Sequence, residues 1–243
     1  MMIQIPHTKI WITFRNLLFA FSLLLSNPAA AQNEADRWEK AIQAANQAYG
    51  LAQIELALTN YSVALDIAKM NFTEDDPRLF LTFLVIAPAL RANGQIDAAA
   101  KAMDRGLSLQ VALYGEDNPE LMTQYPILAG IYADIGNYER AEELYRIAML
   151  MMSGFMGENH PRTVTLRENL ASLLYTAGKV EEGLLLFGQV VLDWELALGP
   201  NHIRQSISYH GYAQMLKNAG RAEESLNAKQ RATEISTAWD AAR

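Results

Sequence analysis

The sequence predicts an all-α fold, a solenoid of antiparallel helix pairs stacked one after another. Its main support is a 42-residue repeat carried by two markers that keep the same register. One marker is a turn segment that starts at residues 73, 115, 157 and 199, and the other is a glycine at positions 94, 136, 178 and 220. Within the repeats, apolar residues recur at intervals of three and four, which is the helical period, and no stretch alternates as a strand would.

The first element, residues 1–31, has the parts of a secretory signal peptide. It contains Lys9 and Arg15 but no Asp or Glu, and the mostly apolar run 17–25 follows. Small residues then lead to a predicted cleavage after Ala31. The run has nine residues, whereas a helix needs roughly 20 to span a bilayer. We therefore expect export, with no membrane span once the signal is removed.

The alternative for this segment is an uncleaved membrane anchor that borrows the apolar residues between Ile10 and Phe14. Arg15 interrupts that longer stretch, which favours cleavage. The remaining chain divides into a short N-terminal tail, residues 32–37, and a solenoid, residues 38–243, with room for about five repeats.

Composition limits the possible functions. The 243 residues include no cysteine, which excludes disulfides, thiolate metal sites and a cysteine nucleophile. The net charge is −7, and removing residues 1–31 leaves 18 basic and 27 acidic residues, a net charge of −9. This balance argues against nucleic acid as the main partner, because phosphate binding needs clustered Lys and Arg. An acidic, exported chain without thiols fits a bacterial periplasm.

The third full repeat shows how each unit forms two helices. Residues 163–177 carry leucines at positions 166, 170, 173 and 174, spaced for one helix face. Gly178 ends this helix, because glycine readily takes the left-handed backbone found after a helix end. Residues 181–198 form the second helix, and Gly199 begins the next turn.

Helix starts and interruptions are also marked. Asp76 and Asn118 are predicted N-caps, and prolines follow them directly. The prolines suited to a first helical position are Pro77, Pro119 and Pro161. Pro88 and Pro126 fall inside predicted first helices, where each should kink its helix or force an early start.

Small and large residues follow a fixed order in the second full repeat. They are Leu128, Ala129, Tyr132, Gly136, Tyr138, Ala141, Tyr145 and Ala148. Small residues such as Ala129 and Ala141 suit the points where two helices cross closely. The order resembles the tetratricopeptide repeat (TPR), in the 42-residue form similar to kinesin light chain. The resemblance covers residues 38–236 and implies a right-handed superhelix that acts as an interaction scaffold.

The first repeat is eroded but keeps the register. Its small and large positions are Ala45, Ala48, Ala52, Ile54, Ala57, Tyr61 and Ala64. The last repeat has Lys229 where the family prefers a large apolar residue. We therefore expect residues 229–231 to face water as a cap on the array.

The resemblance implies a concave groove lined by the first helices, which binds an extended peptide or a helix. The family's groove positions fall on Arg91, Thr123, Asp134, Glu168, Asn169, Ser172, Tyr175, His210, Gln214 and Lys217. This polar set suits hydrogen bonding to a peptide backbone. The alternative is a solvated inner face without a ligand. A clamp for a C-terminal carboxylate is not expected, because Arg91 and Lys217 lie three repeats apart.

The chain has no recognisable catalytic or metal-binding motif. His160 and His202 are 42 residues apart, which indicates a shared turn position before a helix rather than a metal site. His210 is either a ligand contact or part of a polar face. Acidic residues recur at the starts of second helices, where their negative charge interacts favourably with the helix dipole. They are Asp97, Glu139, Glu181 and Glu223.

Methionine and aromatic residues between positions 138 and 156 can be interpreted in two ways. They either fill the hydrophobic core or form an adaptable binding surface. We expect core positions for the cluster Met149, Met151, Met152 and Met156, and likewise for Tyr138, Tyr145 and Phe155.

The function expected from the sequence is an exported TPR scaffold for protein–protein or protein–peptide interaction in the cell envelope, periplasmic or secreted. No cofactor, metal ion or catalytic activity is expected. One alternative is a chaperone-like assembly factor or a subunit of a larger envelope complex, which would expose one large apolar patch. An enzyme is a further alternative, but it would need a convergent pocket that the sequence does not supply.

Overall fold

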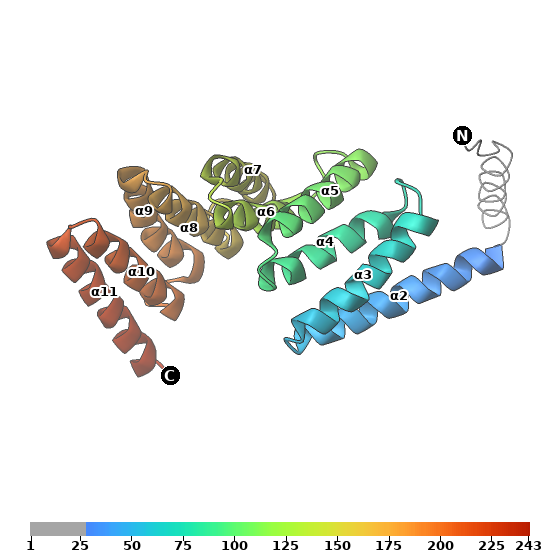
Figure 1. The fold of residues 1–243 in the computed structure, drawn as a ribbon. Helices are drawn as coiled ribbons and strands as arrows, with labels where there is room; N and C mark the ends of the chain where they lie inside the picture. The colour runs from blue at the N-terminus through green and yellow to red at the C-terminus, as the bar shows by residue number, and fades with distance from the viewer. Residues whose placement is uncertain (1–27) are drawn as a thin grey trace, which may run out of the picture. The chain divides into compact units, whose positions relative to one another are not determined.

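The fold is described from a computed structural model, which defines residues 28–243. This part of the chain forms ten helices and no strand. The helices are α2 (Pro28–Gly50), α3 (Ile54–Asn71), α4 (Pro77–Ala92), α5 (Ile96–Tyr114), α6 (Leu121–Asp134), α7 (Tyr138–Met156), α8 (Pro161–Thr176), α9 (Val180–Leu198), α10 (Ile203–Asn218) and α11 (Ala222–Ala241) (Figure 1). The predicted signal peptide lies almost entirely outside the described residues.

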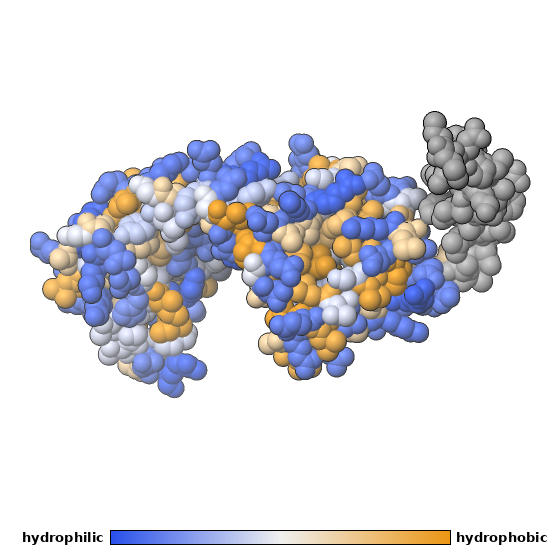
Figure 2. Space-filling model, in the orientation of Figure 1, coloured by the Kyte–Doolittle hydropathy of each residue, from blue (hydrophilic) through white to orange (hydrophobic). Residues whose placement is uncertain are grey.

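The chain divides into two compact units, one ending at Gln110 and the other spanning Val111–Arg243. In the first unit, α2 packs along α3, and α3 packs on α4. Trp38 on α2 also donates a hydrogen bond from its indole nitrogen to the Thr82 hydroxyl on α4, over 2.7 Å. In Figure 2, the hydrophobic side chains visible on this unit gather over α3 and α4.

The eroded first repeat forms a complete helix pair. The alanines Ala45 and Ala48 on α2 and Ala57 and Ala64 on α3 are buried, and Tyr61 is buried beside them, whereas Ala52 in the turn is exposed. The Tyr61 hydroxyl donates to the Asn46 side chain over 2.6 Å. Helix α2 begins at Pro28, so residues 32–37, expected as a tail, are helical and continuous with the repeat.

The second unit contains three successive helix pairs: α6 with α7, α8 with α9, and α10 with α11. Helix α7 also packs on α8, and α9 on α10, so each pair is stacked on the next. The expected ranges 163–177 and 181–198 agree with α8 and α9 to within two residues. The all-α fold of stacked helix pairs is confirmed.

The recurring glycines supply left-handed turns inside each pair. Gly94, Gly136, Gly178 and Gly220 have φ between 76° and 85°. Ala52 occupies the same register in the first repeat and has a φ of 57°. A left-handed backbone is unfavourable for alanine because its Cβ crowds the carbonyl oxygen.

Replacing Ala52 by glycine should therefore stabilise the first unit. We expect Ala52→Gly to raise the free energy of unfolding by about 0.5–1 kcal/mol, because relief of strain exceeds the entropy that glycine adds to the unfolded chain. The reverse change, Gly136→Ala, should lower it by about 1 kcal/mol. Urea unfolding followed by circular dichroism tests both. A loss of stability in Ala52→Gly would show that the left-handed backbone at Ala52 is not strained.

Helix starts confirm one of the two predicted N-caps, because Asp76 caps α4 whereas Asn118 does not cap α6. Pro77 and Pro161 occupy the first helical position of α4 and α8, as expected. Pro119 does not, because α6 begins at Leu121. Asn118 instead accepts a hydrogen bond from the backbone N–H of Glu120 in the preceding turn, over 2.9 Å. This local hydrogen bond forms, but the α-helix starts two residues later than the sequence indicates.

Pro88 and Pro126 lie inside α4 and α6, and neither proline ends its helix. The acidic residues expected at the starts of second helices lie in the first turns of α5, α7, α9 and α11. The expected cap at residues 229–231 is exposed to solvent.

The N-cap residue Asp76 makes part of the folding stability depend on pH. Its carboxylate accepts hydrogen bonds from the backbone N–H and from the side chain of Arg78, the latter at 2.9 and 2.5 Å. The hydrogen bond from the Arg78 side chain lowers the pKa of Asp76, and burial opposes this only in part. Stability from this carboxylate is therefore present above its ordinary pKa and is lost as the pH falls through the lowered value.

The variant Asp76→Asn tests this coupling, because asparagine still caps a helix but carries no titratable charge. We expect it to lose less stability than the wild type on acidification from about pH 7 to about pH 2, a range that begins above the ordinary carboxylate pKa and continues below it. Thermal unfolding across this range measures the difference. An equal loss in both proteins would assign the acid sensitivity to other groups.

The predicted core positions are only partly correct. Met152 and Tyr145 are buried, and Tyr138, Met149, Met151 and Met156 are half-buried. Phe155 was expected in the core but is 67% exposed, because its position near the end of α7 faces solvent. Within residues 28–243, none of the helices combines the length and apolar character needed to cross a membrane.

Candidate functional site

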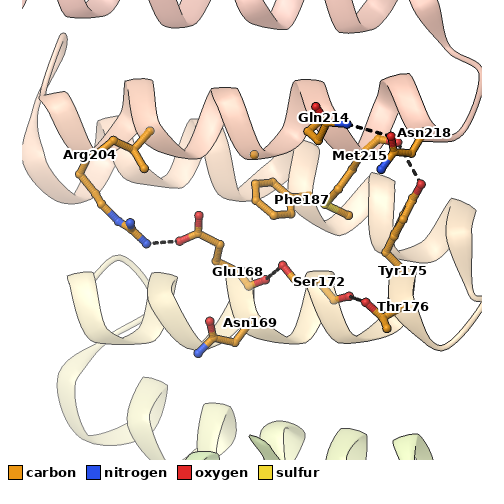
Figure 3. A pocket seen from close by; sticks show the side chains of 12 residues that line it. Glu168, Asn169, Ser172, Tyr175, Thr176, Phe187, Arg204, Gln214, Met215 and Asn218 are labelled. Carbon is orange, nitrogen blue, oxygen red and sulfur yellow. Dashed lines mark hydrogen bonds and ion pairs between the residues drawn. The ribbon is translucent and has the colours of Figure 1, made fainter. Parts of the chain in front are cut away.

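An open groove of about 500 Å³ lies in the second unit, where α8 faces α10. Its lining residues are Glu168, Asn169, Ser172, Tyr175, Thr176, Phe187, Arg204, Ile207, Gly211, Gln214, Met215 and Asn218 (Figure 3). Those on α8 and α10 recur at helical spacing, so each first helix presents one face to the groove. Phe187 comes from α9, behind the other two helices.

The floor of the groove is apolar because of Gly211. A Cβ added at this glycine would lie 3.4 Å from Cζ of Phe187, so the missing side chain brings the groove down to the edge of this ring, which is otherwise packed in the core and 3% exposed. Phe187 stacks on Tyr212 with ring centroids 5.8 Å apart, which fixes the ring. Met215, which is half-buried, and the exposed Ile207 complete an apolar well in this floor.

Two predicted peptide contacts also hold the groove together. Glu168 on α8 forms an ion pair with Arg204 on α10, and the Arg204 guanidinium lies over the Trp194 ring, 4.8 Å from its centroid. The Tyr175 hydroxyl donates to the Met215 carbonyl on α10 over 3.2 Å. Replacing Glu168 or Tyr175 would therefore loosen the packing of α8 on α10 as well as remove a ligand contact.

Other polar groups on the rim are available to a ligand. The Asn169 amide makes no hydrogen bond with any described residue and projects from the edge of α8 away from α10 (Figure 3). Gln214 donates to Asn218 over 2.8 Å in an exposed pair. The Ser172 hydroxyl donates to the Glu168 carbonyl and can still accept a hydrogen bond. Amides and hydroxyls of this kind can pair with both the N–H and C=O groups of a peptide backbone.

The groove carries little net charge. Of the described residues that line it, one is a cation, Arg204, and its partner Glu168 is the one anion. Burial raises the pKa of the neighbouring Tyr212 hydroxyl, which stays neutral. The site therefore suits an uncharged segment of peptide better than an acidic or basic one.

The structure gathers half of the predicted groove residues. Glu168, Asn169, Ser172, Tyr175 and Gln214 line the groove. His210 and Lys217 are exposed on α10 outside the lining. Thr123 and Asp134 are exposed near opposite ends of α6, and Arg91 is exposed on α4 in the other unit.

Sequence reasoning missed the apolar floor of the groove. Phe187 belongs to a second helix, whereas the groove prediction considered first helices alone. Gly211 lies 42 residues after Asn169, so the repeat register could have identified it as a gap in the groove wall.

The two turn histidines lie directly before α8 and α10, as expected, and each also caps its helix. Nδ1 of His160 accepts from the backbone N–H of Arg162 over 3.2 Å, and Nδ1 of His202 accepts from that of Arg204 over 3.1 Å. His202 also packs on Trp239, with ring centroids 4.8 Å apart. In the described part of the chain, no three His, Asp or Glu side chains are grouped to hold a metal ion.

Comparisons with known proteins place the chain among repeat structures. The family model described as tetratricopeptide repeat matches residues 120–191 and, in a second alignment, residues 165–238. No curated protein matches the chain.

Several solved structures share the fold. Nearly identical TPR-like repeats attributed to a kinesin light chain of Podosopora anserina align with a TM-score of 0.73 at 21% identity, covering 82% of this chain and 94% of that one. BtubC (BKLC) from P. vanneervenii aligns with a TM-score of 0.69 at 20% identity, covering 95% and 91%. YrrB, a TPR protein with an unusual peptide-binding site, aligns with a TM-score of 0.52 at 16% identity, covering 82% and 92%.

Proposed function

Because the chain is a tetratricopeptide repeat protein, we propose that it is an exported scaffold that binds a peptide segment of a partner protein in the groove between α8 and α10. The observation that carries the proposal is the apolar well over Phe187, opened by Gly211 and rimmed by amides. A site of this design takes one apolar side chain into the well and hydrogen-bonds the backbone on either side. YrrB, which shares the fold, is described as binding a peptide.

The well sets the expected specificity. One leucine- or phenylalanine-sized side chain contributes roughly 1.5–3 kcal/mol on burial. The near-neutral lining gives no reason for a charged residue beside it. We expect the bound peptides to share a single apolar anchor flanked by uncharged residues. The proposal gives the protein no catalytic role.

A peptide selection tests this proposal. Peptides displayed on phage are selected against the purified protein, and the enriched sequences are measured by fluorescence anisotropy with Gly211→Leu and Gly154→Leu variants. Gly211→Leu fills the well, whereas an added Cβ at Gly154 on α7 meets no atom within 4 Å. We expect Gly211→Leu to weaken binding at least tenfold and Gly154→Leu to leave it unchanged. Equal binding by both variants would contradict the groove assignment.

The export part of the proposal rests on the signal-like residues 1–31. N-terminal sequencing of the protein recovered from a bacterial periplasm tests it. We expect Gln32 as the first residue. Recovery of an unprocessed chain starting at Met1 in the membrane fraction would contradict secretion and would indicate that the segment is an uncleaved membrane anchor.

A further inference from the structure

A strip of leucines is exposed on the outer face of α9, on a different part of the second unit from the groove lining. Leu185, Leu192 and Leu196 are 79%, 50% and 67% exposed. Their spacings of seven and four place all three within an arc of roughly 40° on an α-helix, over a length of about 16 Å. We call Leu185, Leu192 and Leu196 the α9 leucine strip.

A hollow of about 460 Å³ adjoins this strip. Its apolar walls are Leu184, Leu185, Leu192 and the ring of Tyr212, and Glu181, Gln189 and Arg221 form its polar side. Gly188 opens it, because a Cβ at this position would lie 3.0 Å from the Tyr212 hydroxyl oxygen. The hollow offers a seat for one large apolar side chain next to the strip.

The apolar surface extends toward the preceding repeat. Leu150 on α7 lies 42 residues before Leu192 and is 74% exposed. Arg146 on α7 forms an ion pair with Glu182 on α9 over 2.9 Å, which holds the two outer helices beside each other. Leu150 is therefore an exposed leucine at the equivalent position of a helix that this ion pair joins to α9, and it adds to the apolar surface that a bound helix could contact.

The charge around the strip is negative. Helix α9 contains no Lys or Arg, and exposed carboxylates flank its leucines at Glu181, Glu182 and Glu195. The nearest cations are already paired with acids, and Lys179, directly before α9, bonds Glu142. Arg146 bonds Glu142 and Glu182. Arg221 bonds Glu224 and Glu181. Negative charge is therefore in excess along the strip.

The negative charge limits which partner can bind the α9 leucine strip. A second copy of the chain would place the same carboxylates against one another if two α9 helices paired, in either direction, and like charges repel. An anionic lipid surface would be repelled for the same reason. We propose that the α9 leucine strip docks an amphipathic helix of a partner protein, with leucine-sized residues on one face and Lys or Arg beside them. This site is additional to the peptide groove.

A defined peptide pair tests the proposal. The probes are an 18-residue helical peptide of leucine and lysine, with leucines on one face, and a matched peptide with glutamate in place of lysine. Binding to the purified protein is measured by fluorescence anisotropy. We expect saturable binding of the lysine peptide alone. The double variant Leu185→Gln/Leu192→Gln should weaken it at least tenfold, and Glu181→Lys/Glu195→Lys should also weaken it.

Two control variants separate this site from the rest of the molecule. Leu56→Gln changes an exposed leucine on α3 in the first unit, and Gly211→Leu fills the groove; both should bind the lysine peptide as the wild type does. Equal binding by wild type and the double leucine variant would overturn the proposal, as would a matching loss in Leu56→Gln. A wild-type dimer in sedimentation that dissociates in the double variant would also overturn it, in favour of self-association. Loss of groove binding alone would leave this site intact.

Discussion

Replacing Gly183 by valine is expected to lower the free energy of unfolding of the second unit by about 3 kcal/mol or more. Gly183 is buried at the crossing of α8 and α9, at the register where other repeats have Ala99, Ala141 and Ser225. A Cβ added there would lie 2.7 Å from the Tyr175 nitrogen, 2.8 Å from the Ala171 oxygen and 3.0 Å from Cα of Tyr175. These atoms belong to backbone, which cannot rotate away, so the two helices must separate.

Separation of α8 from α9 would also move Tyr175 and its hydrogen bond across the groove. Circular dichroism during urea unfolding measures the loss. The matched control is Gly154→Ala on α7, where an added Cβ meets no atom within 4 Å; it should stabilise by up to about 1 kcal/mol through helix propensity. A Gly183→Val protein as stable as the wild type would show that this crossing is not closely packed.

The second large effect is expected at Asp193. Its buried carboxylate forms an ion pair with Arg167 on α8 and accepts a hydrogen bond from Gln189 over 3.0 Å. Asp193→Ala leaves the mostly buried Arg167 with one remaining acid, Glu158 in the exposed turn at 2.6 Å. Removing one member of a buried pair costs about 3 kcal/mol or more, because the other charge stays in a poorly solvated site.

Two further variants identify the cause of that loss. Glu158→Ala removes the exposed partner of Arg167 and should cost below about 1 kcal/mol. The double variant Arg167→Met/Asp193→Leu removes both buried charges and should recover most of the stability lost in Asp193→Ala. A loss of stability in Asp193→Ala no larger than that in Glu158→Ala would contradict this prediction, because the ion pair of Arg167 with Asp193 would then behave as a surface pair.

The fold was predictable because each repeat carries its own local signals. Gly178 ends α8, Pro161 begins it, and both recur at the repeat spacing, so tertiary packing had little left to decide. Predictions failed where a single residue type suggested one position and the packed structure placed the residue in another. Pro119 suggested a helix start, but α6 begins at Leu121. Phe155 has an apolar side chain, but it lies on the solvent side of α7.

The candidate site was only half predictable. Family register identified Asn169 and Gln214, because groove positions on first helices follow from the repeat alone. The floor depends on Phe187 reaching between two helices at a missing side chain, Gly211, which is a property of the packed pair. The ion pair of Glu168 with Arg204 joins two repeats, so neither residue revealed its role by local sequence.

Photo-crosslinking inside cells tests the central claim most directly. A benzoylphenylalanine placed at Gln214 faces the groove, and one placed at Lys229 on the exposed side of α11 serves as the control. We predict that one partner protein crosslinks at Gln214 through a segment with an apolar anchor, that Lys229 does not capture it, and that adding Gly211→Leu abolishes the product. A partner captured equally at both positions, or one that persists with Gly211→Leu, would contradict recognition in the groove between α8 and α10.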